Sequence, residues 1–257
     1  DLRMSRGLGD VYKRQMEDLA DRTIWAMGEQ LKCGDFVPFV FEHKFNMEVG
    51  DGDRKQLMSG TIDRVDICEN DTDVYVRIID YKTGKKDFNI VKTYYGIDIQ
   101  LMVYMEAAMK LVAKMRPGKN VLPAGVFYYN ISDPIVSATN ESAEEIEDKI
   151  KGELRLKGMV NSDKDIAEKM DNTEGTSLNI PVSRKADGGF DSRRSKVMNT
   201  EQFNMLGRFV DVRAVDTADR IAGGDIRRSP YKDGQFSSCD RCPYGAVCGL
   251  SLIHISE

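Results

Sequence analysis

Several features that define particular classes of protein are scarce or missing in this sequence. There are five cysteines and two histidines among 257 residues. Five cysteines in so long a chain, with no charged and then apolar start of the secretory type, argue against a disulfide-held extracellular scaffold. No apolar run approaches the roughly 20 residues that cross a bilayer. No glycine-rich P-loop occurs, so this piece is not expected to hydrolyse ATP. We predict a cytoplasmic location.

The charge balance also excludes a broadly basic protein. The formal net charge is -5, with 31% charged and 41% hydrophobic residues. These values are ordinary for a globular domain with a sizeable core. Mild acidity argues against nonspecific nucleic-acid binding over the whole surface, but it leaves room for a local basic groove.

Periodicity alternates between helical and strand patterns. Gly and Asp clusters at residues 50–55 and 68–73 separate three apolar stretches, which we predict to be successive antiparallel strands. Asp98 is the expected N-cap of the helix that follows. The pattern predicts an α+β fold with a mixed central sheet flanked by helices. The expected helices are 16–34, 97–115 and 200–224, the strands are 36–49, 56–67, 74–82 and 121–131, and residues 138–199 read as a charged helical and loop insertion.

Two strands carry charges among their apolar positions. Alternation places Asp80 and Lys82 on the face that holds Val74, Val76 and Ile78, and it places Asp63 on the face of Val65 and Ile67. If the strands pair, the two carboxylates converge, and they repel unless a proton or cation intervenes. Mg²⁺ suits such oxygen ligands. Alternatively, both aspartates end strands and are satisfied by neighbouring cations or turn amides. Asp66 lies on the opposite face and reads as a salt-bridge partner.

Three motifs together resemble the PD-(D/E)XK nuclease superfamily, in particular its RecB-like branch, which includes CRISPR-associated exonucleases. They are GTID at 60–63, IDYKTG at 79–84 and QLMVY at 100–104. The resemblance implies a restriction-endonuclease-like fold in which Asp63 and Asp80 bind Mg²⁺ and Lys82 assists the attacking water. It also implies that Gln100 and Tyr104, one helical turn apart, contact DNA beside the site.

Other polar residues near these motifs are weaker candidates. The resemblance implies a histidine on a helix upstream of the strands, and no residue matches it. His43 reads as a structural strand residue, and the adjacent Glu42 as a lesser candidate for a supporting acid. Lys85 and Lys86 directly follow the predicted catalytic strand, so we expect them to contact DNA phosphates.

The C-terminal region holds the spacing C-x₂-C-x₅-C, formed by Cys239, Cys242 and Cys248. Thiolates at this spacing are typical metal ligands, and the spacing alone does not separate Zn²⁺ from a [4Fe–4S] cluster. With most of residues 16–249, this tail resembles the nuclease domain of the AddB family of helicase/deoxyribonuclease subunits. That resemblance implies an iron–sulfur cluster with a distant fourth cysteine, expected to be missing from this piece. On chemistry alone Cys33 or Cys68 could supply the fourth ligand; neither is favoured, and both read as plain thiols.

Both ends resemble translated sequencing adapter. SRGLGDVYKRQ lies within residues 1–15, and LSLIHISE makes up residues 250–257. We expect neither end to be native, so that His254 carries no function. The expected organisation is then a nuclease domain at 16–238 and a cysteine motif at 239–249, cut from a longer protein.

The sequence therefore predicts a Mg²⁺-dependent DNA exonuclease domain acting on single-stranded DNA. By resemblance it serves double-strand break repair and recombination beside an AddA-like helicase/nuclease subunit. The alternatives are a stand-alone RecB-like CRISPR-associated exonuclease and a catalytically silent DNA-end-binding module. All the enzyme hypotheses require Asp63, Asp80 and Lys82 to lie on one face of the sheet.

Overall fold

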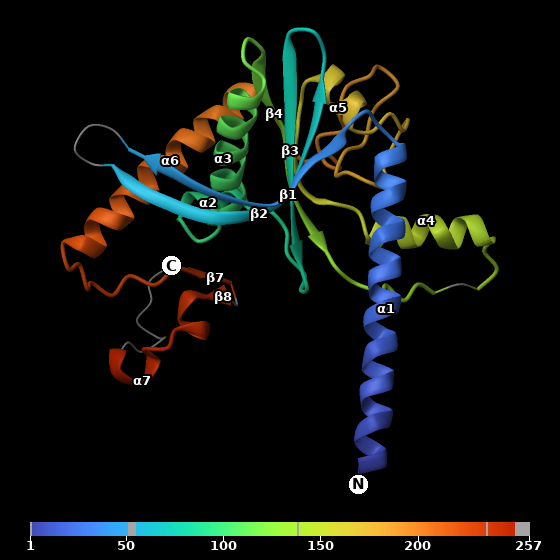
Figure 1. Cartoon of the computed structure of the whole chain (residues 1–257), viewed down its shortest axis with the longest axis horizontal. Coiled ribbons are helices and arrows are strands. Elements are labelled where there is room, and N and C mark those ends of the chain that lie inside the picture. The colour runs from blue at the N-terminus through green and yellow to red at the C-terminus, as the bar shows by residue number, and fades with distance from the viewer. Residues whose placement is uncertain (1, 51–54, 138, 235, 250–257) are drawn as a thin grey trace.

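A six-stranded mixed sheet flanked by helices forms the body of the protein (Figure 1). The computed structural model describes residues 2–50, 55–137, 139–234 and 236–249. The strands follow the order β1-β2-β3-β4-β5-β6. The predicted α+β class, the mixed sheet and the cysteine-bearing C-terminal tail are confirmed.

The first three strands are antiparallel neighbours, as predicted. They are β1 (Val37–Val49), β2 (Gln56–Glu69) and β3 (Asp73–Lys82). The Asn70 side chain closes the second turn by accepting hydrogen bonds from the amides of Thr72 at 2.9 Å and Asp73 at 2.7 Å, a local pattern typical of Asn in turns. The first predicted turn falls largely on residues 51–54, which lie outside the described residues.

The fourth strand, β4 (Asn120–Asn130), runs parallel to β3 and pairs Tyr128 with Asp80. Parallel neighbours need a crossover, and here it contains α2 (Ile90–Tyr94) and α3 (Gln100–Met115). One face of α3 is apolar and buries residues such as Leu101 and Val112 against the sheet. The crossover therefore carries the Gln100–Tyr104 motif at the start of α3, which packs on β3 and β4.

Residues 138–199 contribute to the sheet, which their sequence pattern did not indicate. They form α4 (Ala143–Glu153), β5 (Lys157–Asn161), α5 (Lys164–Met170) and β6 (Val197–Met198). Gly158 allows β5 to approach β4 closely, because an added Cβ would lie 1.9 Å from the carbonyl oxygen of Val126. The expected insertion is thus joined to the central sheet through β5 and β6.

Two apolar cores lie on opposite faces of the sheet. Figure 1 shows α3 and α6 (Thr200–Ala222) on one side, and α1 (Leu2–Lys32), α4 and α5 on the other. Val65, Val76 and Ile78 pack toward α3, whereas Ile79 and Phe127 pack toward α1 and α5. The tail follows α6 as β7 (Lys232–Asp233), β8 (Phe236–Ser237), a 3₁₀ turn η1 (Ser238–Arg241) and α7 (Gly245–Cys248).

The foreign origin of residues 1–15 stays a prediction, and the 250–257 stretch lies outside the described residues. Among the described helices, none combines the length and apolar character needed to cross a membrane.

A buried ion network ties β2 to β3 on the α1 face. Both carboxylate oxygens of Asp66 accept hydrogen bonds from Arg64, at 2.6 and 2.8 Å, and Arg77 donates to one of them at 2.9 Å. All three side chains are at most 3% exposed. Arg77 also lies 4.9 Å from the ring centroid of Phe36. The prediction that Asp66 is a salt-bridge partner is confirmed.

We expect Asp66→Asn to destabilise the protein by about 3–5 kcal/mol, because it leaves two buried guanidinium groups without their counter-charge. Asp71→Asn is the matched control, since Asp71 is exposed in the β2–β3 turn, and its effect should stay within about 0.5 kcal/mol. Urea unfolding followed by circular dichroism measures both. Equal stability of the two variants would contradict the role given to the network.

Candidate active site

Asp63 and Asp80 lie opposite each other where β2 and β3 separate. The last paired positions are Arg64 and Ile79, so the two aspartates occupy the next position, and opposite residues of an antiparallel pair share a face. Asp63 Oδ2 accepts a hydrogen bond from the Tyr81 amide at 2.8 Å. This oxygen accepts the hydrogen bond that a backbone carbonyl would accept if the β2–β3 ladder continued. The bond holds the Asp63 carboxylate in place.

Asp80 is a buried carboxylate whose close partner is the Lys82 ammonium group. Its side chain is 2% exposed, and Oδ2 accepts no hydrogen bond of regular geometry from the described residues, although Lys82 Nζ lies 2.5 Å away. Burial raises the pKa of Asp80, the ammonium group of Lys82 opposes this rise, and the charge of Asp63 adds to it. A buried carboxylate oxygen beside a second carboxylate is a suitable ligand for a cation.

Tyr128 of β4 is the β-sheet neighbour of Asp80 and lies beside the two carboxylates. Lys82 Nζ and Lys86 Nζ lie 5.7 Å and 5.3 Å from its ring centroid, within the range of cation–π attraction. Its hydroxyl donates a 2.7 Å hydrogen bond to Asp98 Oδ1. Burial, and then the bond to Asp98, raise the pKa of Tyr128 well above its usual range. The phenol therefore remains a neutral donor.

Sequence reasoning misassigned Asp98. The expected N-cap role is wrong, because α3 begins after Ile99, which makes no side-chain cap. The Asp98 side chain is instead buried, with 5% of its surface exposed. Its Oδ1 atom accepts the hydrogen bond from the Tyr128 hydroxyl and also lies 3.2 Å from Lys86 Nζ. A short polar side chain before an amphipathic helix is the usual N-cap signal. No local signal distinguishes it from a carboxylate that binds a residue 30 positions away.

Gln100 and Tyr104 lie on the face of α3 that meets the sheet beside these residues. Gln100 Nε2 donates to the Tyr104 hydroxyl at 2.8 Å, and the Tyr104 ring packs edge-on against Phe45 at 5.8 Å. Gly60 makes room for this packing, because a Cβ there would lie 3.0 Å from Phe45 and 3.4 Å from Tyr104. Asp80 and Tyr104 both act electrostatically on Tyr128. The three predicted motifs therefore meet on one face of the sheet.

Lys86 and Lys85 have different environments in the loop after β3. Asn130 holds the Lys86 backbone from both sides, accepting from its amide and donating to its carbonyl at 3.0 Å each. The Lys86 ammonium group faces Asp98, whereas Lys85 is exposed. Of these two predicted DNA contacts, Lys85 is the more accessible to a phosphate.

The residues present fit a Mg²⁺ ion but not a metal cage made of protein ligands alone. Within the described ranges there is no group of three or more His, Cys, Asp or Glu side chains that could hold a metal. Asp63 and Asp80 supply two carboxylates, and Mg²⁺ commonly uses one or two and takes its other ligands from water and substrate phosphates. The burial of Asp80 beside the second carboxylate, that of Asp63, supports this assignment.

Glu42 and His43 lie on β1, near Asp63 but outside that carboxylate pair. Glu42 stands between Phe41 and His43, which pair with Arg64 and Ile62, so its backbone is opposite Asp63. Its φ of 47° is unusual for a residue other than glycine. Its side chain is exposed and joins no metal-ligand group in the described part of the chain. The supporting-acid role stays a prediction.

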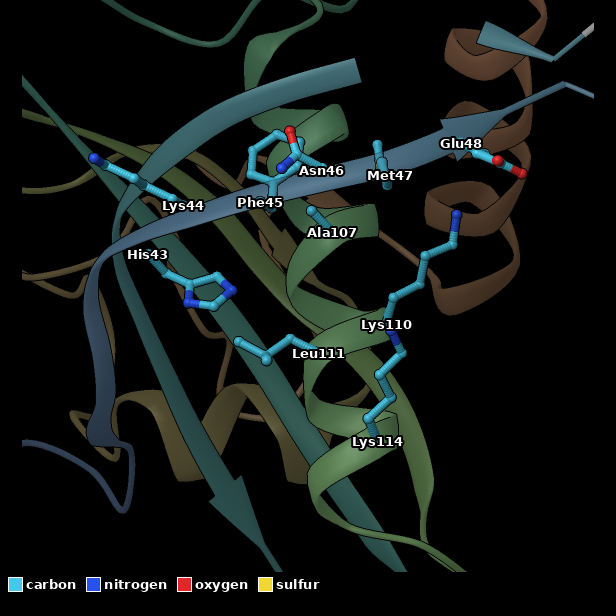
Figure 2. A pocket seen from close by; sticks show the side chains of 10 residues that line it. All are labelled: His43, Lys44, Phe45, Asn46, Met47, Glu48, Ala107, Lys110, Leu111 and Lys114. Carbon is cyan, nitrogen blue, oxygen red and sulfur yellow. The ribbon is translucent and has the colours of Figure 1, made fainter. Parts of the chain in front are cut away.

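His43 lines a groove of about 480 Å³ between β1 and α3. Figure 2 shows its ring directed toward Leu111, with Lys110 and Lys114 extending from the same helix. None of Asp63, Asp80 and Lys82 lines this groove. His43 therefore belongs to this groove, whose lining does not include the carboxylate pair.

The cysteines do not form a ready metal site. Cys239 and Cys248 are partly buried, Cys242 is exposed, and the described residues bring no three of the five cysteines into a ligand group. Burial raises the pKa of Cys33 and of Cys68, which favours their protonated thiol forms. The tail as arranged does not fit an iron–sulfur cluster.

Comparison with known proteins gives one family. A family model described as "PD-(D/E)XK nuclease superfamily" matches residues 2–249. The chain is 37% identical over 250 residues to an ATP-dependent helicase/deoxyribonuclease subunit of Clostridium botulinum (strain Hall), covering 93% of this chain and 22% of that protein. It is 34% identical over 238 residues to the protein of the same name from Clostridium kluyveri, covering 88% and 20%. The chain thus spans about a fifth of the length of these relatives.

We expect Mg²⁺ to stabilise the wild-type chain and not the Asp80→Asn variant. A ligand at ten times its Kd adds about 1.4 kcal/mol to the free energy of unfolding. Without metal, Asp80→Asn should be at least as stable as wild type, because it removes a buried carboxylate opposite another. Thermal unfolding with and without Mg²⁺ measures both effects, with Asp71→Asn as control. An equal rise in Tm for wild type and Asp80→Asn would exclude Asp80 as a ligand.

Proposed function

Because the chain belongs to the PD-(D/E)XK nuclease superfamily, we propose that it is a Mg²⁺-dependent DNA nuclease domain that hydrolyses phosphodiester bonds. The observation that carries the proposal is that Asp63 and Asp80 lie opposite each other just beyond the last β2–β3 pair, with Lys82 2.5 Å from Asp80. We assign the nuclease domain to residues 16–238 and a separate cysteine motif to 239–249.

Each residue of the site has a chemical role in this proposal. Asp63 and Asp80 hold Mg²⁺, which when bound would offset phosphate charge and make a coordinated water more acidic. Lys82 orients the attacking water through its ammonium group. Gln100 and Tyr104 contact the DNA backbone beside the cleft, and the exposed Lys85, with Lys86, contacts neighbouring phosphates.

The relatives' names support a more specific assignment. They are helicase/deoxyribonuclease subunits, so we place this domain in an AddB-like subunit acting with an AddA-like partner. In that setting it would cleave single-stranded DNA exonucleolytically during double-strand break repair and recombination, in the cytoplasm. The intact Asp63, Asp80 and Lys82 argue against a catalytically silent DNA-binding module. The relatives' names favour this assignment over a stand-alone CRISPR-associated exonuclease.

We expect the chain to degrade an end-labelled single-stranded oligonucleotide with Mg²⁺ and not with EDTA. Asp80→Ala and Lys82→Ala should each lower the rate by about 100-fold or more, since they remove a metal ligand and the group that positions water. Asp71→Ala should leave the rate unchanged. The size of labelled products over time is the measurement. Equal degradation by wild type and Asp80→Ala would mean that the assigned site is wrong.

For the tail we propose that Cys239, Cys242 and Cys248 bind a [4Fe–4S] cluster, with Zn²⁺ as the alternative. The proposal rests on the C-x₂-C-x₅-C spacing and on similarity to the helicase/deoxyribonuclease subunits. Since the three thiols are not grouped in the structure, binding requires the 238–248 segment to rearrange and a further ligand to complete the site.

We expect anaerobic reconstitution with iron and sulfide to give the visible charge-transfer absorption of a cluster, and Cys242→Ser to lose it. Cys33→Ser is the matched control, because Cys33 lies in another part of the fold. Iron and zinc contents per chain, measured by mass spectrometry, decide between the two metals. Equal iron binding by both variants would rule out the tail as the site.

A further inference from the structure

Two tyrosines at the end of α2 expose large aromatic surfaces beside the candidate active site. Tyr94 is 58% exposed and Tyr95 is 52% exposed. Tyr94 stacks on Phe209 of α6 with a centroid distance of 5.2 Å and an interplanar angle of 6°. Tyr95 stands edge-on to Tyr94 at 5.2 Å. We call Tyr94 and Tyr95 the tyrosine pair.

The tyrosine pair is held on a short but firmly fixed element. Asn89 caps α2 by accepting from the amides of Val91 and Lys92, at 2.9 and 3.1 Å. The buried hydroxyl of Thr93 donates to the carbonyl of Asp98 at 2.8 Å. The ring of Tyr95 also packs against Tyr231 of the tail, at 4.9 Å. The rings are therefore preorganised, yet about half of their surface remains in water.

Position links the tyrosine pair to the cleavage site. α2 lies in the crossover between Lys82 at the end of β3 and Gln100 at the start of α3, and Figure 1 shows it at the foot of α3. Asp98 connects the two places directly. Its carbonyl accepts from Thr93 of α2, and its carboxylate accepts from Tyr128, which pairs with Asp80.

The charge around the tyrosine pair indicates an anionic ligand. Residues 82–98 contain four lysines and two aspartates, although the whole chain has a net charge of -5. Asp87 is paired with Lys196 and Asp98 with Lys86, and Lys82 is paired with Asp80. Lys85 is exposed, and Lys92 Nζ lies 4.4 Å from the ring centroid of Phe236, which packs against Tyr231 of the tail. Exposed aromatic rings within a locally basic surface match the two parts of an unpaired nucleic-acid strand, its flat bases and its phosphates.

We propose that the tyrosine pair is a base-stacking surface for single-stranded DNA bound at the candidate active site. Bases of a duplex already stack on one another, whereas unpaired bases offer free faces. The surface would thus favour unpaired strands and hold the nucleotides next to the cleaved phosphate. The inference deepens the proposed nuclease function and rests on it.

The test uses binding rather than cleavage. The complete 257-residue chain is titrated, in EDTA, into a fluorescent single-stranded oligonucleotide of roughly 16 nucleotides. The double variant Tyr94→Leu/Tyr95→Leu replaces both rings with leucine. The single variant Tyr95→Leu leaves the contact between Tyr94 and Phe209 in place, so it separates loss of stacking from loss of that contact. Tyr94→Phe/Tyr95→Phe keeps the rings and removes the hydroxyls. Phe41→Leu is the matched control, because Phe41 is also 58% exposed and lies near Arg64, on the α1 side.

We expect the double leucine variant to bind about 10-fold or more weakly, since each stacked base contributes roughly 5- to 100-fold in affinity. Tyr95→Leu should show part of this loss, whereas the phenylalanine variant and Phe41→Leu should bind as wild type does. An oligonucleotide of the same length with abasic sites should bind wild type and the leucine variants equally. Circular dichroism and Tm establish that each variant is folded.

Three results would overturn the inference. The first is wild-type affinity in Tyr95→Leu and in the double leucine variant. The second is an equal loss on intact and abasic strands, which would assign the effect to the backbone or the fold. The third is unchanged DNA binding with lost association to a helicase subunit, which would make the surface a protein-docking site. If the chain bound single-stranded DNA through the two tyrosines but did not cleave it with Mg²⁺, the result would count against the nuclease proposal and not against the stacking surface.

Discussion

The register between β2 and β3 is the constraint on which the candidate site depends. A slip by one residue would turn Asp63 to the opposite face from Asp80. Asp66 and Arg77 are directly paired across the same two strands, and with Arg64 they form the buried ion network on the reverse face. Charge pairing on one face thus sets the alignment that brings two like charges together on the other.

A buried aspartate has a different environment on each of the two faces of the sheet. Asp66 has its carboxylate fully satisfied by guanidinium groups. Asp80, equally buried and on the adjacent strand, has only the partly exposed Lys82 as its cationic partner at close range and faces another carboxylate. A folded chain holds such an arrangement only when the surrounding structure determines it. The buried side chains of β3 and β4 on both faces of the sheet therefore hold Asp80 in this position.

Local patterns predicted much of this arrangement. Strand alternation placed Asp80 and Lys82 on one face, and helical spacing placed Gln100 beside Tyr104, because both depend only on backbone periodicity. The bond from Tyr128 to Asp98 joins separate elements, so no local pattern carried it. The two-residue β6 is too short to give alternation. The exposure of Tyr94 depends on how α6 packs, which sequence alone does not specify. The functional roles of these residues remain predictions.

The parallel pairing of β3 with β4 has a consequence for the order of assembly. The β2–β3 hairpin closes through a short turn, so Asp63 and Asp80 can meet early in folding. Tyr128 can pair with Asp80 only after residues 83–119, which connect β3 to β4, have crossed over the sheet. A newly made chain would then bring its two aspartates together before Tyr128 and Asp98 are in place beside them.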